Sequence, residues 1–406
     1  MTALVTLAEV HAARELLDGV TRYTPMEPSR PLTAKLGGPV WLKCENLQRG
    51  GSFKVRGAYV RIARLSPEER ARGVVAASAG NHAQGVAVAA AALDTAATVF
   101  MPVGAALPKI AATRGYGATV ELAGATVDEA LVAAGEFADR TGAVLIHPFD
   151  HADVIAGQGT VALEIVEQVP DVRTILVGIG GGGVISGIAV AAKALRPDIR
   201  IIGVQAAGAA AFPASLAQGR PVRLPEFGTI ADGIAVGCPG EVTFEHVSKL
   251  VDDVVTVTEE DISRALLVLL ERGKLLAEPA GVVGVAALLA GVAGEVETPA
   301  VTVLSGGNID PMLLLRVIEH GLASAGRYYT FTVRCTDRPG HLAKLLGEVA
   351  ALGANIVDVD HRRQDPRLRL GEVEISMSVE TRGAAHADRL TGALRAAGYT
   401  VTPLSR

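Results

Sequence analysis

Between about residue 73 and residue 304, short runs rich in β-branched residues alternate with longer amphipathic runs rich in alanine and leucine. This alternation is typical of parallel strands joined by helical crossovers. We expect strands at residues 74–77, 97–101, 119–122, 143–147, 174–179, 200–205, 253–258 and 300–304. Between them we expect helices that include residues 81–93, 127–140, 154–168 and 260–272. Most of the strand segments are apolar throughout, as in sheets covered by helices on both faces. The pattern therefore predicts an open, doubly wound α/β fold.

The pattern changes near residues 324–327, S-A-G-R, after a predicted helix over residues 311–322. The remaining segments predict the order βαββαβ, at residues 328–335, 341–352, 355–362, 371–379, 384–397 and 400–403. This order is typical of a ferredoxin-like module with a core of its own. The basic stretch 361–369 lies between two of its strands, so we interpret it as a solvated hairpin rather than a ligand site.

Composition excludes several classes of partner. The charge is −5, from 38 basic and 43 acidic residues without a long block of one sign, which argues against binding to nucleic acid. No apolar run approaches the roughly 18 residues of a membrane span. The first residues have acids where a signal peptide would have a basic start. Three cysteines, an odd number without a C-x-x-C motif, suit reduced thiols in a cytoplasm.

A lysine follows a glycine pair in the segment E-N-L-Q-R-G-G-S-F-K-V-R-G-A, residues 45–58. Taken alone, Lys54 would be interpreted as a solvated loop residue. However, it opens a predicted helix and follows the apolar Phe53. A partly desolvated amine at the positive end of a helix has a lowered pKa. Such a lysine is nucleophilic and can form a Schiff base.

The segment S-A-G-N-H-A-Q-G, residues 78–85, lies where the strand 74–77 turns into a helix. Ser78 or Asn81 would serve as a helix cap there. The free N–H groups of such a turn also form an anion site, at the strand end where α/β proteins bind ligands. A substrate carboxylate would fit this turn. His82 alone is more simply explained as a structural hydrogen-bonding residue.

Four glycines, Gly180 to Gly183, follow the strand 174–179 and precede a helix. Together with Gly178 they match G-x-G-x-x-G, the dinucleotide pattern. A dinucleotide site needs an acid at the end of the next strand, where this chain has Gln205, and this counts against NAD. Consecutive backbone N–H groups at a helix start suit a single phosphomonoester. A tight packing turn is the alternative, and we expect it to need only one or two glycines.

The segment V-L-S-G-G-N, residues 303–308, follows the last expected strand. Ser305 could cap a helix. Its hydroxyl could also form a hydrogen bond with a ring nitrogen of a ligand that lies across the strand ends.

In this order, S-F-K-x-R-G-A, S-A-G-N-H-A-Q-G, G-G-G-G and S-G-G-N resemble the fold-type II pyridoxal-phosphate enzymes, specifically the threonine and serine dehydratases, or threonine ammonia-lyases. The similarity covers residues 10–325 and includes E-P-A-G at residues 278–281. The C-terminal module, with D-R-P-G and G-A-N-I at its two turns, resembles a single ACT domain.

The resemblance implies two open, mostly parallel α/β domains followed by a regulatory domain. The large cofactor-binding domain would comprise residues 1–52 and 149–326. The small catalytic subdomain would comprise residues 53–148, and the ACT domain residues 327–406.

The resemblance also implies residue roles around pyridoxal 5'-phosphate. Lys54 would hold the cofactor as a Schiff base and later move the Cα proton, Asn81 would bind the pyridoxal hydroxyl, and Ser305 would meet the pyridine nitrogen. The cofactor-binding residues would be Lys54, Phe53, Asn81, Gly180, Gly181, Gly182, Gly183 and Ser305. The substrate-binding residues would be Ser78, Ala79, Gly80, Asn81, His82 and Phe149.

The implied reaction is β-elimination of water. A neutral serine partner leaves the pyridine nitrogen largely unprotonated, which suits elimination. Threonine would give 2-oxobutanoate and ammonia, and serine would give pyruvate and ammonia. No side-chain acid for the leaving hydroxyl is obvious in the sequence, and in the family the cofactor phosphate is the usual candidate.

Two positions separate this chain from the serine racemases that it also resembles. The racemases carry a second serine at the place of Ala79 and an asparagine at the place of Phe149. Alanine cannot protonate a carbanion, and phenylalanine would favour threonine's extra methyl group. One methyl group is worth only about 1 to 3 kcal/mol, so serine should remain a poorer substrate.

We expect no divalent metal. Racemase-like relatives bind magnesium or calcium through a glutamate and an aspartate at places that are Gln205 and Ala211 here, and these offer neither charge nor enough oxygens. Backbone carbonyls could still hold a monovalent cation. His147 and His151 have a metal-like spacing, but Pro148 between them argues against a shared helical face.

The leading hypothesis is a cytoplasmic threonine ammonia-lyase of isoleucine biosynthesis, regulated through its ACT domain by an amino acid such as isoleucine or valine. Gly340, His341 and Asn355 would line the effector site, and ACT domains commonly pair, so we expect a homodimer or homotetramer. The alternatives are a catabolic serine/threonine dehydratase, a β-replacing synthase, and a binding protein that has lost catalysis. Intact Lys54 and the four glycines argue against the last.

Overall fold

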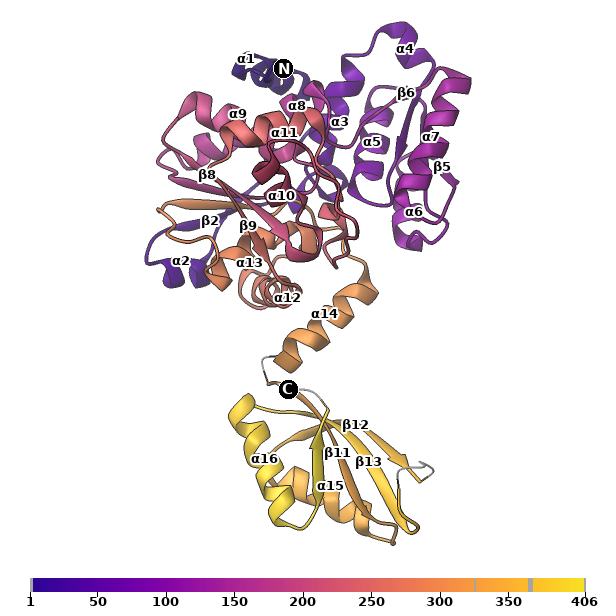
Figure 1. Cartoon of the computed structure of the whole chain (residues 1–406), viewed down its shortest axis with the longest axis vertical. Helices are drawn as coiled ribbons and strands as arrows, with labels where there is room; N and C mark the ends of the chain where they lie inside the picture. The colour runs from indigo at the N-terminus through magenta and orange to yellow at the C-terminus, as the bar shows by residue number, and fades with distance from the viewer. Residues whose placement is uncertain (1–2, 325, 364–367, 405–406) are drawn as a thin grey trace. The chain divides into compact units, whose positions relative to one another are not determined.

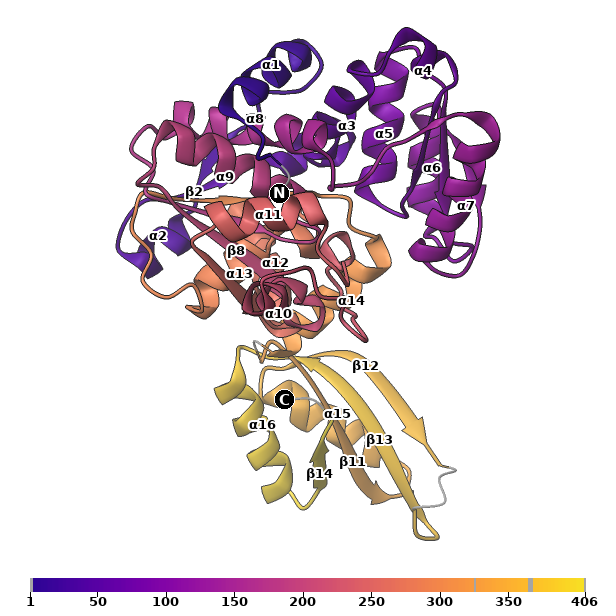
Figure 2. The same ribbon diagram turned by 45° about the horizontal axis from the view of Figure 1, so that its top comes forward.

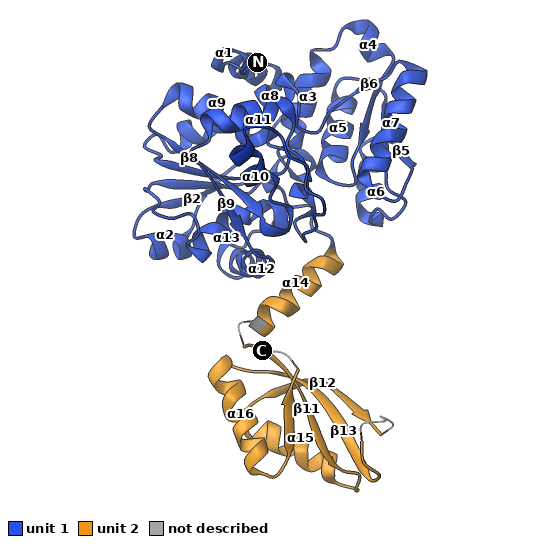
Figure 3. Ribbon diagram, viewed as in Figure 1, with its two compact units in different colours: residues 1–310 blue, residues 311–406 orange. Residues whose placement is uncertain are grey.

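The computed structural model describes residues 3–324, 326–363 and 368–404, and it divides into two compact units, residues 1–310 and 311–406 (Figure 3). Unit 1 contains two sheets in separate lobes, each flanked by helices (Figures 1 and 2). Both sheets are α/β structures in which parallel strands predominate. The α/β class predicted from the sequence is therefore confirmed.

The larger sheet has six strands in the order β1-β2-β10-β7-β8-β9. Their bounds are β1 Met26–Pro28, β2 Val40–Lys43, β7 Thr174–Gly178, β8 Arg200–Ala206, β9 Asp253–Val257 and β10 Ala300–Val303. Only β1 is antiparallel, so the carboxyl ends of the other five strands meet at one edge. The chain builds β7, β8 and β9 outward in one direction and then adds β10 on the other side of β7. The strand order therefore reverses between β10 and β7.

The smaller sheet has four parallel strands in the order β5-β4-β3-β6. Their bounds are β3 Val74–Ala77, β4 Ala97–Met101, β5 Thr119–Leu122 and β6 Val144–Leu145. Here the order reverses between β3 and β6. Ligands of open α/β sheets bind in the crevice at such a reversal, outside the carboxyl ends of the strands. Unit 1 therefore offers two such reversals, one per sheet.

Alanine-rich and glycine-rich helices cover these sheets. The helices of unit 1 are α1 Leu7–Leu17, α2 Arg30–Leu36, α3 Lys54–Ala63, α4 Pro67–Ala71, α5 Asn81–Ala92, α6 Leu107–Gly115, α7 Val127–Thr141, α8 Ala152–Gln168, α9 Gly183–Leu195, α10 Ala211–Gln218, α11 Glu241–Leu250, α12 Glu259–Val268 and α13 Val283–Ala290. Helices α8 and α9 approach closely, because a Cβ on Gly187 would lie 2.3 Å from the carbonyl oxygen of Ile155. Small residues thus bring the helices together over the larger sheet.

Four charged side chains are buried together between α3, α8 and β2. Arg56 is 1% exposed and donates to both carboxylate oxygens of Glu45 at 2.8 and 2.9 Å and to Glu164 at 2.6 Å. Lys43, which is fully buried, donates to the other oxygen of Glu164 at 2.5 Å. We call these residues the buried ion network. It joins the helix that begins with Lys54 to the rest of unit 1.

Unit 2 has the order predicted from the sequence, βαββαβ, after a leading helix α14, Pro311–Ser324. Its remaining elements are β11 Tyr328–Thr336, α15 His341–Ala351, β12 Asn355–Arg362, β13 Glu372–Glu380, α16 Ala384–Ala396 and β14 Thr400–Pro403. The four strands form an antiparallel sheet in the order β12-β13-β11-β14. Apolar residues of α15 and α16 pack with those of the sheet into a separate core.

The structure corrects some details of the sequence prediction. Strand β6 covers only two residues rather than 143–147, since Pro148 has no N–H to extend the pairing. The helix expected at 260–272 ends at Val268 and continues as a π-helical turn to Gly273. Strands β1 and β2 were not predicted. None of the helices in the described residues combines the length and the apolar character that a membrane span needs.

The boundary between the two units differs from the one predicted from the sequence. The division into units assigns residues 311–324 to unit 2, whereas the sequence suggested a boundary after residue 326. Residue 325, within the S-A-G-R segment, lies outside the described residues. The boundaries 1–52 with 149–326, 53–148 and 327–406 stay predictions.

Candidate active site

Four of the segments that were singled out in unit 1 follow a strand beside one of the two reversals, and the lysine segment follows β2, next to β10. The glycines Gly180 to Gly183 follow β7, and Ser305 follows β10. The turn Ser78 to Gly80 follows β3, and the segment His147 to Phe149 follows β6. Direct contacts, described below, join residues of the two sheets. The site is therefore built where the two reversals face each other.

Lys54 is the first residue of α3, and its amine lies within this site. Its Nζ donates to the carbonyl oxygen of Pro148 at 2.9 Å and lies 5.3 Å from the centre of the Phe53 ring. Burial lowers the pKa of the Lys54 amine to about 8, and the negative charge of Glu278 offsets this only in part. About a tenth of this amine is therefore neutral, and so nucleophilic, at pH 7, and about half of it at pH 8, far more than for an ordinary lysine.

Main-chain hydrogen bonds join the loop before Lys54 to the loop that contains Ser305. Phe53 N donates to Ser305 O at 3.2 Å, and Gly307 N donates to Gly51 O at 2.9 Å. Between these bonds, Ser52 and Gly306 form an isolated antiparallel bridge. Ser305 itself is 5% exposed, and its hydroxyl donates to the carbonyl of Ala280 at 3.4 Å. The lysine and the serine are thus held at a fixed separation by backbone alone.

The four glycines have no room for side chains. A Cβ on Gly181 would lie 2.4 Å from the Phe149 ring, one on Gly180 would lie 3.0 Å from Ile234, and one on Gly182 would lie 2.9 Å from Thr243. Packing alone therefore explains all four glycines, so our expectation that a packing turn would need only one or two was wrong. The hydrogen bonding is more informative. None of the four N–H groups donates to an acceptor among the described residues.

The turn after β3 also has backbone N–H groups without an acceptor. Ser78 accepts from Gly80 N at 3.1 Å, which shapes the turn. The N–H groups of Ala79, Asn81 and His82 have no acceptor in the described part of the chain. These groups lie at the start of α5, where the helix dipole is positive. The turn therefore provides a second anion site, suited to a carboxylate.

Asn81 connects the two sheets through its side chain. Its Nδ2 donates to Glu278 at 2.5 Å, and its Oδ1 accepts from Asn308 at 2.8 Å. Burial and the charge of Asp232 raise the pKa of Glu278 to about 7. One of the two Nδ2 hydrogens of Asn81 remains for a ligand. Glu278 and Asn308 were visible in the sequence only as letters of their motifs, because their partners lie about 200 positions away in the chain.

The two histidines near the site are structural. His82 is 4% exposed, and its Nε2 lies 2.8 Å from the carbonyl of Ile146. Burial and the charge of Lys54 lower the pKa of His82 to about 3, so it is neutral at physiological pH. His147 Nδ1 accepts from the backbone N–H groups of Phe149 and Asp150 at 3.3 and 2.8 Å. Neither imidazole is arranged as a catalytic base.

Gln205 is fully buried, and all its polar atoms are used by the backbone. Its Nε2 lies 3.3 Å from the Ile179 carbonyl and 3.4 Å from the Ala209 carbonyl, and its Oε1 accepts from Phe212 N at 2.9 Å. Among the described residues, no group of three or more His, Cys, Asp or Glu side chains is arranged to hold a metal ion.

Comparisons with known proteins connect this geometry to a chemistry. Residues 17–306 match the family model of pyridoxal-phosphate dependent enzymes, and residues 329–399 match that of the ACT domain. The chain is 48% identical to an L-threonine ammonia-lyase of Thermotoga maritima over 398 residues, which cover 98% of this chain and 99% of the relative. It belongs to the pyridoxal-phosphate dependent enzymes, and unit 2 contains an ACT domain.

Solved structures of the family agree with the fold of unit 1. Threonine deaminase isoform 2 of Solanum lycopersicum, in its processed form, is 39% identical, with a TM-score of 0.74, and the match covers 77% of this chain and 86% of that one. Maize serine racemase is 35% identical, with the same TM-score of 0.74, and the match covers 79% of this chain and 99% of that one. Relatives with different reactions in their names thus share this backbone.

The residues present fit pyridoxal phosphate. An amine whose pKa is lowered to about 8 suits attachment to an aldehyde, and four N–H groups without protein acceptors suit a phosphate. The buried hydroxyl of Ser305 is available to a ring nitrogen, because its only hydrogen bond in the described residues is a long one. Lys54, Asn81, Gly180 to Gly183 and Ser305 would hold the group.

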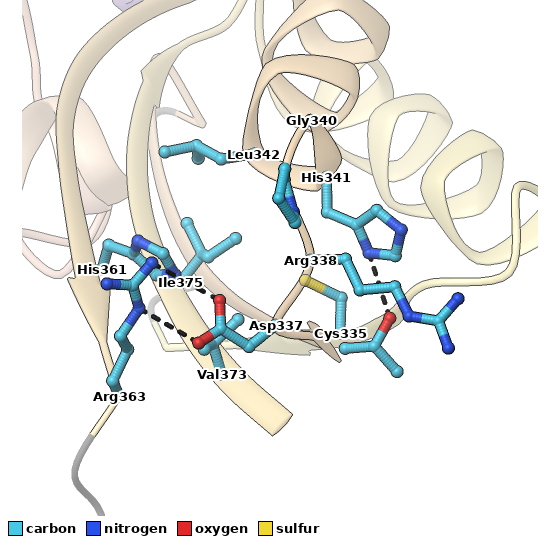
Figure 4. Close-up of a pocket in the computed structure, with 12 residues that line it drawn as sticks. Cys335, Asp337, Arg338, Gly340, His341, Leu342, His361, Arg363, Val373 and Ile375 are labelled. Atoms are coloured by element: carbon cyan, nitrogen blue, oxygen red, sulfur yellow. Dashed lines mark hydrogen bonds and ion pairs between the residues drawn. The ribbon is translucent and has the colours of Figure 1, made fainter. Parts of the chain in front are cut away.

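The ACT domain has a cavity of about 270 Å³ at the turn between β11 and α15 (Figure 4). Its lining consists of Cys335, Thr336, Asp337, Arg338, Pro339, Gly340, His341, Leu342, His361, Arg363, Val373 and Ile375. Arg363 pairs with Asp337 at 3.2 Å, and Thr336 lies 3.1 Å from His341 Nδ1. The buried Nε2 of His361 has no partner among the described residues.

Two of the three predicted effector residues line this cavity and one does not. Gly340 and His341 belong to the lining. Asn355 is exposed at the start of β12, where it donates to Glu380 at 3.2 Å, and it is not part of the lining. His361 and Arg363 come from the basic stretch 361–369, which the sequence suggested was a solvated hairpin. Residues 364–367 of that stretch lie outside the described residues.

Proposed function

We propose that the chain is an L-threonine ammonia-lyase, which eliminates water from L-threonine and releases 2-oxobutanoate and ammonia. The observation that carries this proposal is Lys54, an amine whose pKa is lowered to about 8, in the same unit as two sets of backbone N–H groups without acceptors in the described residues, one suited to a phosphate and one to a carboxylate. The 48% identity to an L-threonine ammonia-lyase over nearly the whole chain supports the same conclusion.

Pyridoxal phosphate, when bound, supplies an aldehyde for the amine and a ring that withdraws electrons from the substrate Cα. The chain's residues would do the rest. The Lys54 amine would remove the Cα proton, since its lowered pKa of about 8 makes the neutral form accessible between pH 7 and 8. The N–H groups of Ala79, Asn81 and His82 would hold the substrate carboxylate, and the neutral Ser305 hydroxyl would face the ring nitrogen.

Substrate preference would depend on Phe149 and Ala79. Phe149 is the residue after Pro148, whose carbonyl accepts from Lys54, and its ring packs against Gly181 of the glycine loop. An aromatic ring favours the methyl group of threonine over serine, so L-serine should be a slower substrate. Ala79 offers no proton donor, which argues against racemisation.

The test is a product assay with the purified full-length chain. We expect 2-oxobutanoate from L-threonine, and pyruvate from L-serine at a lower kcat/KM. Phe149→Asn should shift the ratio of the two kcat/KM values toward serine, by roughly 10-fold or more. The ratio is the useful readout, because the ring also packs on Gly181 and its loss could lower both rates. Absence of 2-oxobutanoate from the cofactor-loaded protein would refute the proposed activity.

We further propose that the ACT cavity binds an aliphatic amino acid, such as isoleucine or valine, that regulates this activity. Arg338 is exposed at the cavity and has no acidic partner among the described residues, so it is available to a carboxylate. Val373, Ile375 and Leu342 supply an apolar surface for an aliphatic side chain. Coupling of about 1 to 3 kcal/mol, or roughly 5- to 150-fold in affinity, is usual between such sites.

Arg338→Met tests this regulation, and Arg382→Met is its matched control. Arg382 is also an exposed arginine of the ACT domain but lies outside the cavity lining. We expect Arg338→Met to retain basal turnover and to lose the response to isoleucine or valine, while Arg382→Met responds as the unaltered chain does. Equal responses in all three proteins would refute the assignment of the effector site.

The remaining proposals concern organisation. We expect a homodimer or homotetramer, which light scattering would measure, and a cytoplasmic location in which the three free cysteines stay reduced. Residues 1–52 with 149–326, 53–148 and 327–406 are proposed as its three domains, with a role in isoleucine biosynthesis for the whole.

A further inference from the structure

Buried side chains form hydrogen bonds with carbonyl groups in and next to the glycine loop Gly180 to Gly183. Thr243, on α11, is fully buried, and its hydroxyl donates to the carbonyl oxygen of Gly181 at 2.6 Å. The same hydroxyl lies 3.2 Å from the carbonyl of Gly240, a longer contact. A threonine hydroxyl has a single proton to donate, so the shorter contact is the dominant hydrogen bond.

The position of Thr243 is itself fixed by Asp150. One carboxylate oxygen of Asp150 accepts from Thr243 N at 3.0 Å, and the other accepts from Glu241 N at 3.1 Å. Asp150 therefore caps α11 with both oxygens. The close approach requires a glycine at position 240, where a Cβ would lie 2.2 Å from the Asp150 carboxyl carbon.

The geometry of the peptide bond makes the hydrogen bond from Thr243 significant. Because the peptide unit is planar and trans, the carbonyl of Gly181 and the N–H of Gly182 point in opposite directions. A hydroxyl that holds the carbonyl on one side therefore directs the N–H to the other side. Gly182 has φ +97°, and its N–H has no acceptor among the described residues. Alternation of this kind forms a concave anion site.

We propose that Thr243 is a positioning residue for the cofactor phosphate: its hydroxyl locks the Gly181–Gly182 peptide so that the Gly182 N–H faces the phosphate. This rests on the proposed function, in which Gly180 to Gly183 bind that phosphate. Gln205 acts in the same sense but more weakly, since its amide lies 3.3 Å from the Ile179 carbonyl and so favours one direction for the Gly180 N–H. Thr243 does not touch the phosphate itself.

The proposal predicts that the hydroxyl matters only for ligands that carry a phosphate. An N–H fixed before binding needs no reorientation when the anion arrives, and this improves affinity. Thr243→Val keeps the shape of the side chain and removes the donor, whereas Thr243→Ser keeps the donor. Thr243→Ala is a second variant without the hydroxyl, for use if the valine variant fails to fold.

The experiment titrates the full-length protein, freed of cofactor, with pyridoxal phosphate and separately with pyridoxal. We expect Thr243→Val and Thr243→Ala to weaken pyridoxal phosphate binding by roughly 10-fold or more, as for a lost hydrogen bond at a charged group. Their affinity for pyridoxal should change less than about 3-fold. Thr243→Ser should match the unaltered chain for both ligands. Thermal unfolding of each cofactor-free variant verifies that it is folded.

The two ligands separate the failure of this inference from failure of the proposed function. If the unaltered chain binds pyridoxal as tightly as pyridoxal phosphate, the phosphate site at Gly180 to Gly183 is wrong. If the unaltered chain discriminates and Thr243→Val discriminates equally well, only the role of Thr243 is refuted. Equal weakening of both ligands by Thr243→Val would likewise refute it, since that result indicates a general structural role.

Discussion

Lys43 and Lys54 are two lysines of unit 1 with different surroundings, and Lys43 is fully buried whereas Lys54 is half-buried. Lys43 donates to Glu164 at 2.5 Å and to Thr24 O and Gln168 Oε1 at 2.9 Å each, so all three N–H bonds have acceptors. Lys54 donates to a single carbonyl, that of Pro148. Burial lowers the pKa of both amines, but the Lys43 proton is held by a contacting carboxylate. Burial alone therefore does not indicate a reactive lysine; a shortage of partners does.

The largest effect that tests this comparison is expected from Lys54→Ala. Turnover should fall by roughly 10³-fold or more, because the Lys54 amine is the group proposed both to attach the cofactor and to move the proton. The melting temperature of the cofactor-free protein should change little, since only one hydrogen bond is lost. Lys54→Arg, which keeps a positive charge but lacks the amine, should be equally inactive. Appreciable turnover in either variant would contradict the assignment.

The buried ion network should behave in the opposite way. Arg56→Met leaves Glu45 without its buried ion partner and leaves Glu164 with Lys43 alone, so the free energy of unfolding should fall by about 3 to 5 kcal/mol. Arg61→Met is the matched control on the same helix, because Arg61 is 21% exposed and pairs with Asp153 at 3.4 Å. It should cost less than about 1 kcal/mol. Denaturant unfolding measures both, and equal losses would mean that the network is not a structural element.

Between these extremes lies an effect of pH on the attachment of pyridoxal phosphate to cofactor-free protein. Only the neutral amine reacts, so the rate should rise roughly tenfold per pH unit below pH 7 and level off above about pH 8. An ordinary lysine, with a pKa of 10.5, would give a rate still rising at pH 9. Because Glu278 raises the pKa of Lys54, Glu278→Gln should move the plateau to lower pH. If the plateau of Glu278→Gln stays at the same pH, Glu278 does not influence the pKa of Lys54.

The smallest effect is expected from the removal of divalent metal ions, which should not change the activity at all. Gln205 is a buried polar group of a third kind, neutral and fully bonded to backbone, at the place where the resemblance to the racemases would put a ligand of a divalent ion. We therefore expect EDTA to leave the activity unchanged, within the error of the 2-oxobutanoate assay. A large loss that magnesium reverses would show that other ligands form a metal site.

Elements with a strong local pattern were predictable from the sequence. Strands β3, β4 and β5 have the predicted bounds, because each is a short β-branched run between polar turns. Strand β2 was missed, although it lies between β1 and β10 in the larger sheet. Its four residues, V-W-L-K, end in the buried Lys43, which interrupts the apolar pattern. Tertiary pairing with Glu164, rather than local preference, allows a lysine there.

In the site, too, features with a local sequence pattern were predictable and long-range contacts were not. Motifs placed Ser305 and the glycines at strand ends, where open α/β sheets bind ligands, and placed Lys54 at the start of a helix. The contact between Asn81 and Glu278 joins residues 197 positions apart, and that between Thr243 and Gly181 joins residues 62 positions apart. Neither contact could be predicted from a local pattern in the sequence.

The backbone bridge between Ser52 and Gly306 has a consequence for the evolution of this enzyme. The lysine loop and the serine loop are joined by N–H and C=O groups, which every residue except proline supplies in full. Substitutions around the substrate can therefore accumulate without disturbing the frame that carries the reactive amine. A gene copy freed from its original role could acquire a new specificity in a few steps. Many substitutions at Phe149 and Ala79 should accordingly change the substrate specificity while the protein still binds its cofactor.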